Sequence, residues 1–488
     1  MTEKDIHDAT ETFSRYGVPA ERIFDEIMRA RYLDYALFQN PENQQYGISI
    51  EDLYENMKKT SDRLGMYGGD ADTYVRAYTL ALRVDPLVFA PEYTGRDEEM
   101  EALMDEVMTK AENAGDTVLF FGVEKYLSCV SRIFDRLSNK RLAFAVESPA
   151  WKKRLQLLFP RCRLMLSSEL AEDKVKYDYI FAAEEERLSS CYISLLKEKG
   201  SMDILIPYEM MLDERIKSWG KELQSLDKLS AYYDVACHER EFAFLRLSPE
   251  GEGSIAFGNA LLSHGQFKGN ELFRMTPALF SEADEWNFDV YAYSAFPGLQ
   301  AILAGNVLHM EHTAGSAFES VKPCPLPAGR YDRLHAGEVR DSGIRKGQEA
   351  PALLEGGEEG VLLEAGDLAL SLYKGKIHAA VVPEGKKFLA GENVYALRSL
   401  GKYTSWYMKL YLDGPVGQMF LETMRLGEGF CFTLTRFLRM PLPLSDEETI
   451  IHAEKMAKEA VLRLAEAEEN WQSIKRSAVG LMMGHFEE

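Results

Sequence analysis

The sequence predicts an α/β protein, with a helical N-terminal region, a doubly wound domain, and then an α+β domain that ends in a C-terminal helix. Three observations lead to this prediction. Short apolar runs alternate with helical stretches between residues 118 and 207, residues 321–444 are rich in short β-type runs, and residues 446–476 form one long amphipathic stretch. Alternating strands and helices indicate a parallel sheet with helices on its faces. A length of 488 residues accommodates two or three such domains.

The doubly wound domain is predicted from a series of short buried runs. These runs are 118–122, 141–147, 163–166, 177–182 and 201–207, with a helix over 126–137 between the first two. In such a sheet the ligand crevice lies beyond the carboxyl ends of the strands. We therefore expect any chemistry at that edge, close to Gly122, Glu147 and Ala183.

Three further segments accompany these strands. Glu147 opens the acidic turn Glu-Ser-Pro-Ala-Trp, residues 199–207 read Lys-Gly-Ser-Met-Asp-Ile-Leu-Ile-Pro, and residues 236–247 form a candidate hairpin. In order and spacing, the strands and these segments resemble the methyltransferase domain of type I restriction-modification systems, the N6-adenine class. The resemblance implies that the Glu147 turn grips the ribose of S-adenosylmethionine, that 199–207 is the family's Gly-Gly-hydrophobic-Leu-Pro strand, and that 236–247 is its closing hairpin.

The loop after the first run departs from this family. The family has an Asp followed by glycines, because only glycine lets the backbone approach the methionine part of the cofactor without a Cβ clash. Here Gly122 is followed by Glu124 and Tyr126, at positions where glycines are expected. We therefore do not expect a complete S-adenosylmethionine to bind, and we predict no cofactor.

The loop after the fourth run departs further. The family carries an Asn-Pro-Pro-aromatic turn there, which accepts the adenine amino hydrogen bond and stacks on the flipped base. This chain has Ala183 followed by Glu184, Glu185 and Glu186, which do neither, and carboxylates repel phosphate. We predict no catalytic residue and a degenerate crevice formed by Gly122, Glu124, Tyr126, Glu147 and Ala183.

The charge is unevenly distributed along the chain. The formal net charge of −22 argues against a nucleic-acid role for the chain as a whole. Residues 321–444, however, hold 16 basic and 14 acidic residues, a balance of +2, whereas residues 445–488 carry −5 and residues 1–320 carry −19. Any DNA-facing surface is therefore expected in the C-terminal third.

That third contains several landmarks in order. They are Arg330 to Ile344, the Leu-Glu-Ala-Gly-Asp run from Leu363, the β-type runs 379–382 and 392–398, a short helix over 405–412, and a closing strand over 434–443. Together they resemble the target-recognition domain in the specificity subunits of type I restriction systems. The resemblance implies that loops of this domain read DNA, without saying which loop residues do so.

Loop cations are the candidates for DNA contact. They are Arg340, Arg345, Lys346, Lys374, Lys376, Lys386, Lys387 and Lys402. For each of them a solvated surface charge is the alternative, since affinity for the DNA backbone needs several cations that act together.

The terminal stretch 446–476 is predicted as a helix. Ser445 and Glu448 form a capping box, and an apolar stripe runs from Ile450 to Ile474. In specificity subunits the corresponding helix packs as a spacer against a partner helix, which implies a protein partner or a homodimer. The alternative is that the stripe folds back on its own chain, because the heptad register is kept only loosely.

The remaining chain supports a division into five parts. They are a helical N-terminal domain (1–112), a degenerate methyltransferase-like domain (113–250), a connecting region (251–320), a target-recognition-like domain (321–444) and a spacer-like C-terminal helix (445–488). Within the connecting region, the aromatic stretch 285–293 fits either strand packing or a base-stacking surface.

Several classes of protein are not expected. The six cysteines have no Cys-x-x-Cys spacing, and the His309-Met-Glu-His312 segment lacks the His-Glu-x-x-His pattern, so no metal site is predicted. No apolar run reaches the roughly 18 residues of a membrane span, and the first residues lack the pattern of a signal peptide, so we expect a cytoplasmic protein without membrane contact.

The leading functional hypothesis is a non-catalytic DNA-binding component of a restriction-modification or defence assembly. The second is a protein-interaction scaffold, since −19 on the first 320 residues suits a basic partner. The third is a residual enzyme that uses S-adenosylmethionine.

Overall fold

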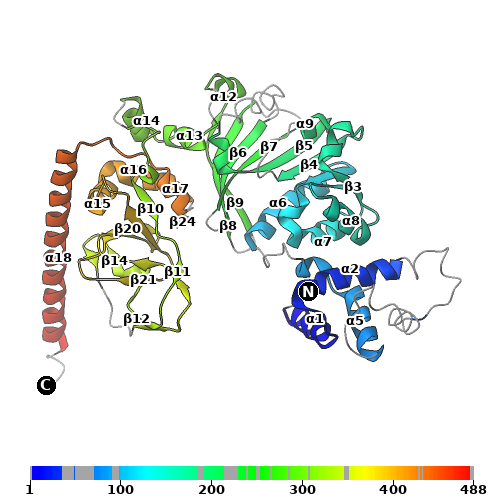
Figure 1. Cartoon of the computed structure of the whole chain (residues 1–488). Helices are drawn as coiled ribbons and strands as arrows, with labels where there is room; N and C mark the ends of the chain where they lie inside the picture. Colours follow the sequence, from blue (N-terminus) through cyan, green and yellow to red (C-terminus); the bar gives the residue numbers. More distant parts are fainter. Residues whose placement is uncertain are drawn as a thin grey trace.

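The computed structural model describes most of the chain. The described residues are 3–35, 49, 71–90, 98–183, 191–213, 229–237, 240–248, 253–263, 266–283, 286–305, 308–345, 351–426, 429–430 and 432–483. Figure 1 shows helices at the N-terminal end, a large central sheet, a β-rich domain and a long terminal helix beside it. The predicted fold class is confirmed.

The N-terminal region is helical where it is described. Its helices are α1 (Glu3–Arg15), α2 (Ile23–Asp34), α5 (Ala71–Arg83) and α6 (Glu98–Asn113). The chain turns between α1 and α2, where Gly17 takes a left-handed φ of 87°. Pro19 then precedes a single 3-10 turn before α2 begins. Between α2 and α5, only Tyr35 and Ser49 belong to the described residues.

The central sheet has its first strand in the middle. The strands β1 (Thr117–Phe121), β2 (Arg141–Val146), β3 (Arg163–Leu166), β4 (Tyr177–Ala183) and β5 (Leu196–Pro207) are parallel and lie in the order β3-β2-β1-β4-β5. The strand order therefore reverses at β1, which places the ligand crevice of a doubly wound fold between the loops after β1 and β4.

The sheet has a separate hydrophobic core on each face. Along β1, Val118 and Phe120 pack with α6, α7 (Leu127–Arg136) and α8 (Pro149–Leu158), whereas Leu119 and Phe121 pack on the opposite face. This alternation is the period of two that a strand imposes on its side chains. The second face is covered by the short helices α9 (Cys191–Ser194), α10 (Tyr208–Met211), α12 (Pro277–Ala283) and α13 (Phe288–Ser294).

An antiparallel hairpin continues the sheet beyond β5. Strands β6 (Leu229–Cys237) and β7 (Arg240–Leu247) pair with each other, and β7 also pairs with β5. The closing hairpin predicted over 236–247 is therefore longer than predicted, because its first strand begins at Leu229. Strands β8 (Ile255–Ser263) and β9 (Gln266–Met275) then extend the same sheet to nine strands. These two strands come from the range expected to be a connecting region, so the sheet does not end at residue 250.

The aromatic stretch 285–293 is neither a strand nor an exposed stacking surface. Its residues from Phe288 onward belong to α13, which Asn287 caps by accepting a hydrogen bond from the Asp289 N–H at 3.0 Å. Trp286, Phe288 and Tyr291 are buried among the aromatic side chains of the second core. The base-stacking interpretation is therefore wrong, because these rings are covered by the sheet. Helix α14 (Pro297–Ala304) follows.

The β-rich domain is built around a four-stranded antiparallel sheet. Its order is β10-β22-β19-β20, with β10 (Phe318–Ser320), β22 (Val394–Ser399), β19 (Leu368–Tyr373) and β20 (Lys376–Val381). Short strands surround it: β11 (Cys324–Pro325), β12 (Gly329–Tyr331), β13 (Arg333–Leu334), β14 (Val339–Arg340), β15 (Gly343–Ile344), β16 (Ala352–Leu354), β17 (Glu359–Gly360), β18 (Leu362–Leu363), β21 (Phe388–Ala390), β23 (Arg425–Leu426) and β24 (Gly429–Phe430).

Helices close this domain where a strand was expected. Helices α15 (Ser405–Asp413) and α16 (Pro415–Thr423) cover the sheet, and the segment predicted as a closing strand over 434–443 begins instead as helix α17 (Leu434–Leu438). The prediction failed because Thr433 caps a helix, accepting a hydrogen bond from the Arg436 N–H at 3.0 Å. Only Pro441 retains a β-bridge, to Thr313.

The terminal helix α18 spans Glu447–Met483. Its cap is Asp446, whose carboxylate accepts from the Thr449 N–H at 2.8 Å, whereas the hydroxyl of Ser445, the residue expected to cap it, bonds to Tyr407. The first half of α18 packs on α15, where Ile450 and Ala457 are buried. Among the described residues, none of the helices is both long and apolar enough to cross a membrane.

A buried cluster of charges joins α17 to the central sheet. Arg436 pairs with Asp234 of β6, and Arg439 pairs with Glu241 of β7 and with Asp289 of α13, the last at 2.7 Å. The cluster therefore contains three carboxylates and two guanidinium groups. Burial outweighs the attraction of both arginines and raises the pKa of Asp234 to about 6. Below about pH 6, a proton on Asp234 balances the excess negative charge.

We expect Asp234→Asn to stabilise the protein relative to the wild type as pH rises from about 4 to 7. The folded state holds the Asp234 proton up to a higher pH than the unfolded state, so the contribution of this group to stability falls through that window, by up to roughly 3 kcal/mol. Asparagine does not titrate. Urea unfolding of both proteins at several pH values measures the difference.

The matched control is Glu241→Gln. The pKa of Glu241 is lowered despite its burial, chiefly by Arg439 and Arg436, so this variant is expected to lose stability relative to the wild type as pH rises. A stability difference for Asp234→Asn that stays flat with pH would contradict the charge balance assigned to the cluster.

Candidate functional site

The crevice expected at the carboxyl edge of the sheet is tightly closed around Gly122. Gly122 takes a left-handed φ of 71°, and its N–H donates to the carbonyl of Ala145 at 3.1 Å. A Cβ built on Gly122 would lie 2.4 Å from the carbonyl oxygen of Ala183. Only glycine fits here, because the loop after β1 touches the end of β4.

Glu124 bonds to the neighbouring loop after β2. Its Oε1 accepts hydrogen bonds from the backbone N–H groups of Glu147, at 2.8 Å, and Ser148, at 2.9 Å. Its Oε2 is buried and has no hydrogen-bond partner among the residues that the structure describes. Burial raises the pKa of this carboxyl group.

Lys125 crosses from the first loop to the fourth strand. Its Nζ donates to the Ala183 carbonyl at 3.2 Å and lies 3.7 Å from Oε1 of Glu147. The Glu147 side chain, 62% exposed, faces solvent at the place expected for a ribose ligand. Lys125 therefore links the ends of β1, β2 and β4, a role that the sequence did not indicate.

Tyr126 lies in the core beneath the crevice. Its hydroxyl donates to the Phe121 carbonyl at 3.0 Å, and its ring meets Phe181 edge to face at 5.5 Å. Burial raises the pKa of Tyr126 well above its usual value. The two large rings next to Gly122, Phe121 and Tyr126, are thus packing residues, and the side chains that occupy the crevice are those of Glu124 and Lys125.

These residues do not fit the methionine part of S-adenosylmethionine. The Glu124 carboxylate already holds the amides of Glu147 and Ser148, and Lys125 ties together the two loops that flank the switch point of the sheet. A bound carboxylate would also meet the unpartnered Oε2 of Glu124. Glu184, Glu185 and Glu186 lie outside the described residues.

The predicted loop cations fall into two groups at opposite ends of the four-stranded sheet. At the turn between β19 and β20, Tyr373 pairs with Lys376, so Lys374 and Lys376 lie at this end of the sheet. Arg340 lies at the same end, because it follows Gly337, which lies beside the Tyr373 ring. Lys386, Lys387 and Lys402 lie near the other end, beyond Val381 and Leu368. Lys346 lies outside the described residues.

Arg345 is not a free loop cation. Its guanidinium pairs with Glu468 of α18 at 3.0 Å and donates to the Ala465 carbonyl at 3.1 Å, so it fastens the terminal helix to the domain. Lys387 is likewise paired, with Glu364 at 2.6 Å. Arg340, Lys374 and Lys376 are exposed, and none of the three makes an ion pair within the described part of the chain.

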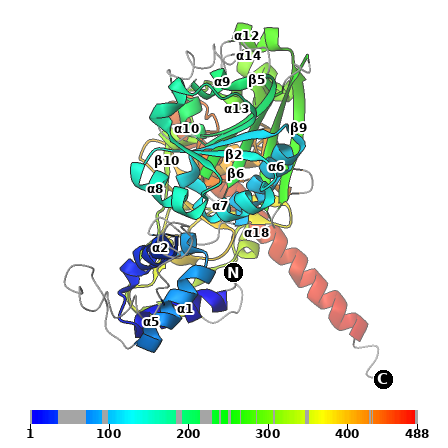
Figure 2. The same ribbon diagram turned by 90° about the vertical axis from the view of Figure 1, so that its right-hand side faces the viewer.

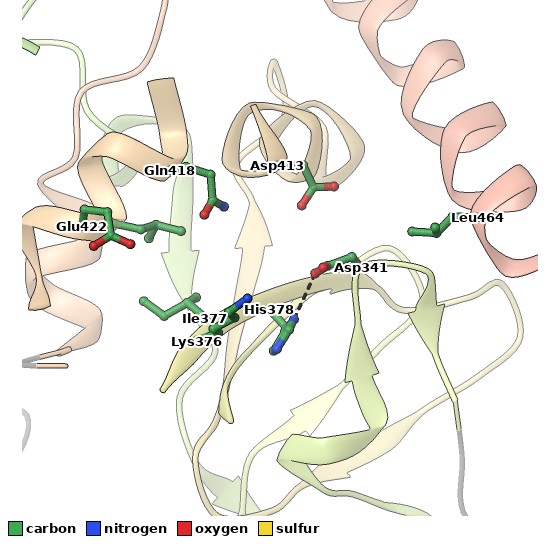
Figure 3. Close-up of a pocket in the computed structure, with 9 residues that line it drawn as sticks. Asp341, Lys376, Ile377, His378, Asp413, Gln418, Glu422 and Leu464 are labelled. Carbon is green, nitrogen blue, oxygen red and sulfur yellow. Dashed lines mark hydrogen bonds and ion pairs between the residues drawn. The ribbon is translucent and has the colours of Figure 1, made fainter. Parts of the chain in front are cut away.

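A polar cavity of about 570 Å³ lies beside Lys376, and no sequence motif indicated it. Figure 3 shows Asp341, His378 and Asp413 pointing into it from three different elements. The His378 Nδ1 lies 3.0 Å from Asp341, which orients the ring, and Asp413 pairs with Lys409 at 2.8 Å. Within the described residues, no group of three or more His, Cys, Asp or Glu side chains could hold a metal ion.

No protein-family model and no curated protein matches the chain. Among solved structures, the type IIG restriction endonuclease BpuSI aligns with 93% of this chain and 74% of its own, at 8% identity and a TM-score of 0.37. A putative class I S-adenosylmethionine-dependent methyltransferase from Listeria monocytogenes aligns with 55% and 99%, at 11% identity and a TM-score of 0.29. The ribosomal protein L11 methylase from Lactobacillus delbrueckii subsp. bulgaricus covers 32% and 79%, at 16% identity and a TM-score of 0.25.

At these identities and TM-scores the likeness carries no argument. The fold assignment rests on the strand order and register of the central sheet itself.

We expect Glu124→Ala to lower the free energy of unfolding by about 1–3 kcal/mol, because the amides of Glu147 and Ser148 lose their acceptor. Glu124→Gln keeps Oε1 and should cost less. Denaturant unfolding measures both. Glu147→Ala, which removes an exposed side chain, serves as the control and should have little effect. Equal losses for the Ala and Gln variants would show that Glu124 does not support the loop through these bonds.

Proposed function

We propose that this chain is a non-catalytic DNA-binding or target-recognition component, related to the methyltransferase and specificity subunits of type I restriction-modification systems. The proposal rests on one contrast. Glu124 and Lys125 make contacts within the chain at the crevice, whereas the cations at the β19–β20 turn make no ion pair among the described residues. The function that remains is therefore electrostatic recognition of DNA by the cations of that turn.

The DNA contact is proposed for Arg340, Lys374 and Lys376. Three exposed cations at one end of a sheet suit neighbouring phosphates, and phosphate contacts position a protein on a duplex without specifying sequence. The adjoining cavity contributes Asp341 and Glu422, which repel phosphate, so the backbone contact is assigned to the turn and not to the cavity.

The buried cluster at α17 supports this role. Arg436 and Arg439 anchor the recognition-like domain on the central sheet through fully or nearly buried ion pairs. The cations of the turn therefore keep a constant position relative to the sheet, and a target could be presented to a partner subunit in a defined orientation.

We expect duplex DNA to bind at about 50 mM salt, with affinity that falls as salt rises. The triple change Arg340→Ala, Lys374→Ala, Lys376→Ala should weaken binding and lower the slope of log affinity against log salt by up to about 2.7, the value for three phosphate contacts. A gel-shift or anisotropy titration with a mixed-sequence duplex measures both quantities.

The matched control removes the three lysines at the opposite end, Lys386, Lys387 and Lys402, and should leave the slope almost unchanged. No binding of the wild type at about 50 mM salt would overturn the proposal. Measurable heat on calorimetric titration with S-adenosylmethionine would instead favour the third candidate, a residual S-adenosylmethionine-dependent adenine methyltransferase.

A protein-interaction scaffold is the second candidate, and the terminal helix favours it. From Ala460 onward the a and d positions of α18 continue as Leu464, Ala467, Trp471 and Ile474, and these side chains are exposed. Trp471 is 56% and Ile474 58% exposed. Glu468 still bonds to Arg345 and Ser342, and Figure 2 shows the end of the helix nearest the C-terminus extending away from the rest of the chain. Such a stripe suits a partner helix.

We expect Trp471→Ala with Ile474→Ala to abolish self-association, or association with a partner, while DNA affinity stays unchanged, because Trp471 and Ile474 follow Leu464, the stripe residue that shares a cavity with Lys376, by about two to three helical turns. Sedimentation velocity of the wild type and variant tests the first part, and the duplex titration tests the second. A wild type that remains monomeric at tens of micromolar and gains no partner in its native operon context would contradict the scaffold.

A further inference from the structure

A groove between the N-terminal region and the central domain is independent of both surfaces discussed above. It lies between α2 and α8 and has a volume of about 620 Å³, within the range of roughly 300–1,000 Å³ that is common for ligand sites. Its lining is mainly apolar, but it includes the cations Lys153 and Arg154. Neither the degenerate crevice nor the recognition-like domain contributes to it.

Two helical stripes face each other across this groove. Met28, Tyr32 and Tyr35 share one face of α2 and its C-cap, at spacings of four and three residues. Lys153 and Leu157, four residues apart on α8, line the other side. The tyrosine rings are not part of a core, since Tyr32 is 60% and Tyr35 51% exposed.

The spacing of the two helices is fixed at one end of the groove. Phe24 of α2 meets Trp151 of α8 at 5.8 Å between ring centroids, and the Arg154 guanidinium lies over both rings at 4.9 and 5.1 Å. Arg154 also pairs with Asp25 at 3.5 Å. The packing of α2 on α8 therefore sets the spacing of the helices at this end of the groove.

The charge around α8 is opposite to that of its surroundings. Residues 149–163 contain five basic and no acidic side chains, within a stretch of 320 residues that carries −19. Three of the five are paired, Lys152 with Glu169, Arg154 with Asp25 and Arg163 with Asp173. Lys153 and Arg161 make no ion pair within the described part of the chain, and Arg161 directly follows the groove residue Pro160.

We propose that the α2–α8 groove binds single-stranded nucleic acid. Unstacked bases lie on the exposed rings of Tyr32 and Tyr35, and Lys153 and Arg161 neutralise the phosphates that flank them. Aromatic side chains beside a cationic backbone track are the combination that holds single strands without sequence preference, because every base offers a face to stack.

The aromatic wall favours a single strand over a duplex. In a duplex the base faces are covered by their neighbours, so a protein reaches only phosphates and groove edges, and two exposed tyrosines would gain nothing. A single strand offers its faces, and it also brings the negative charge that the local excess of basic residues requires. This inference does not depend on the duplex contact proposed for the β19–β20 turn.

Fluorescence anisotropy of the full chain with a labelled 12-nucleotide oligo(dT) at about 50 mM salt tests the inference. Tyr32→Ala with Tyr35→Ala should weaken binding about tenfold or more. Tyr32→Phe with Tyr35→Phe keeps both rings and should bind within about twofold of the wild type. Lys153→Ala should weaken binding and reduce its salt dependence.

Controls separate this site from the turn and from misfolding. Leu279→Ala removes another exposed apolar side chain, on α12, and should leave oligonucleotide affinity unchanged. The Arg340, Lys374 and Lys376 triple variant should lower duplex binding alone. The inference is overturned if wild type does not bind oligo(dT), if the double Ala variant binds as well as the wild type, or if a mononucleotide competes as strongly as the oligonucleotide.

Discussion

The buried ion cluster between α17 and the central sheet is the interaction on which the arrangement of the molecule depends. Three carboxylates and two arginines are withdrawn from water there, which is costly unless every charge keeps its partner. Separating the recognition-like domain from the sheet would leave Asp234, Glu241 and Asp289 without their arginines. The domain is therefore seated in one position, and Arg439 adds a contact with the Tyr208 ring, 3.8 Å from its centroid.

The position of that cluster also explains how the carboxyl edge of the sheet is used. Asp234 pairs in register with Ala243, which pairs with Ile206 near the end of β5, so α17 covers this edge from the β5 side. On the β1 side, Lys125 and Glu124 tie the loops together. In a doubly wound fold this edge is where ligands bind. Here it is occupied from both sides by the chain's own contacts, and the surfaces that remain accessible lie elsewhere.

The sequence predicted the strands because their signal is local. Apolar runs such as Val118 to Phe121 and the 236–247 hairpin report burial and pairing directly, and the structure has them in the expected order. The local signal failed where a cap decided the element. Thr433 caps helix α17 where a strand was expected, and Asn287 caps helix α13 in the aromatic stretch for which strand packing was one expectation. The roles of Lys125, Arg345 and Arg436 had no local signal, because their partners are distant in sequence. The one sequence feature that pointed to the cluster is Asp234, a charged residue between Tyr233 and Val235 in β6.

A net charge of −22 is a weaker guide to partners than it first suggests. Exposed charges are screened beyond about 8–10 Å at physiological salt, so a phosphate group responds to the few side chains within that distance and not to the total. Lys374 and Lys153 themselves make no ion pair among the described residues, and an exposed tyrosine lies beside each of them. The acidic excess acts in the opposite way. It limits non-specific attraction and so confines nucleic acid to sites where shape or stacking adds to charge.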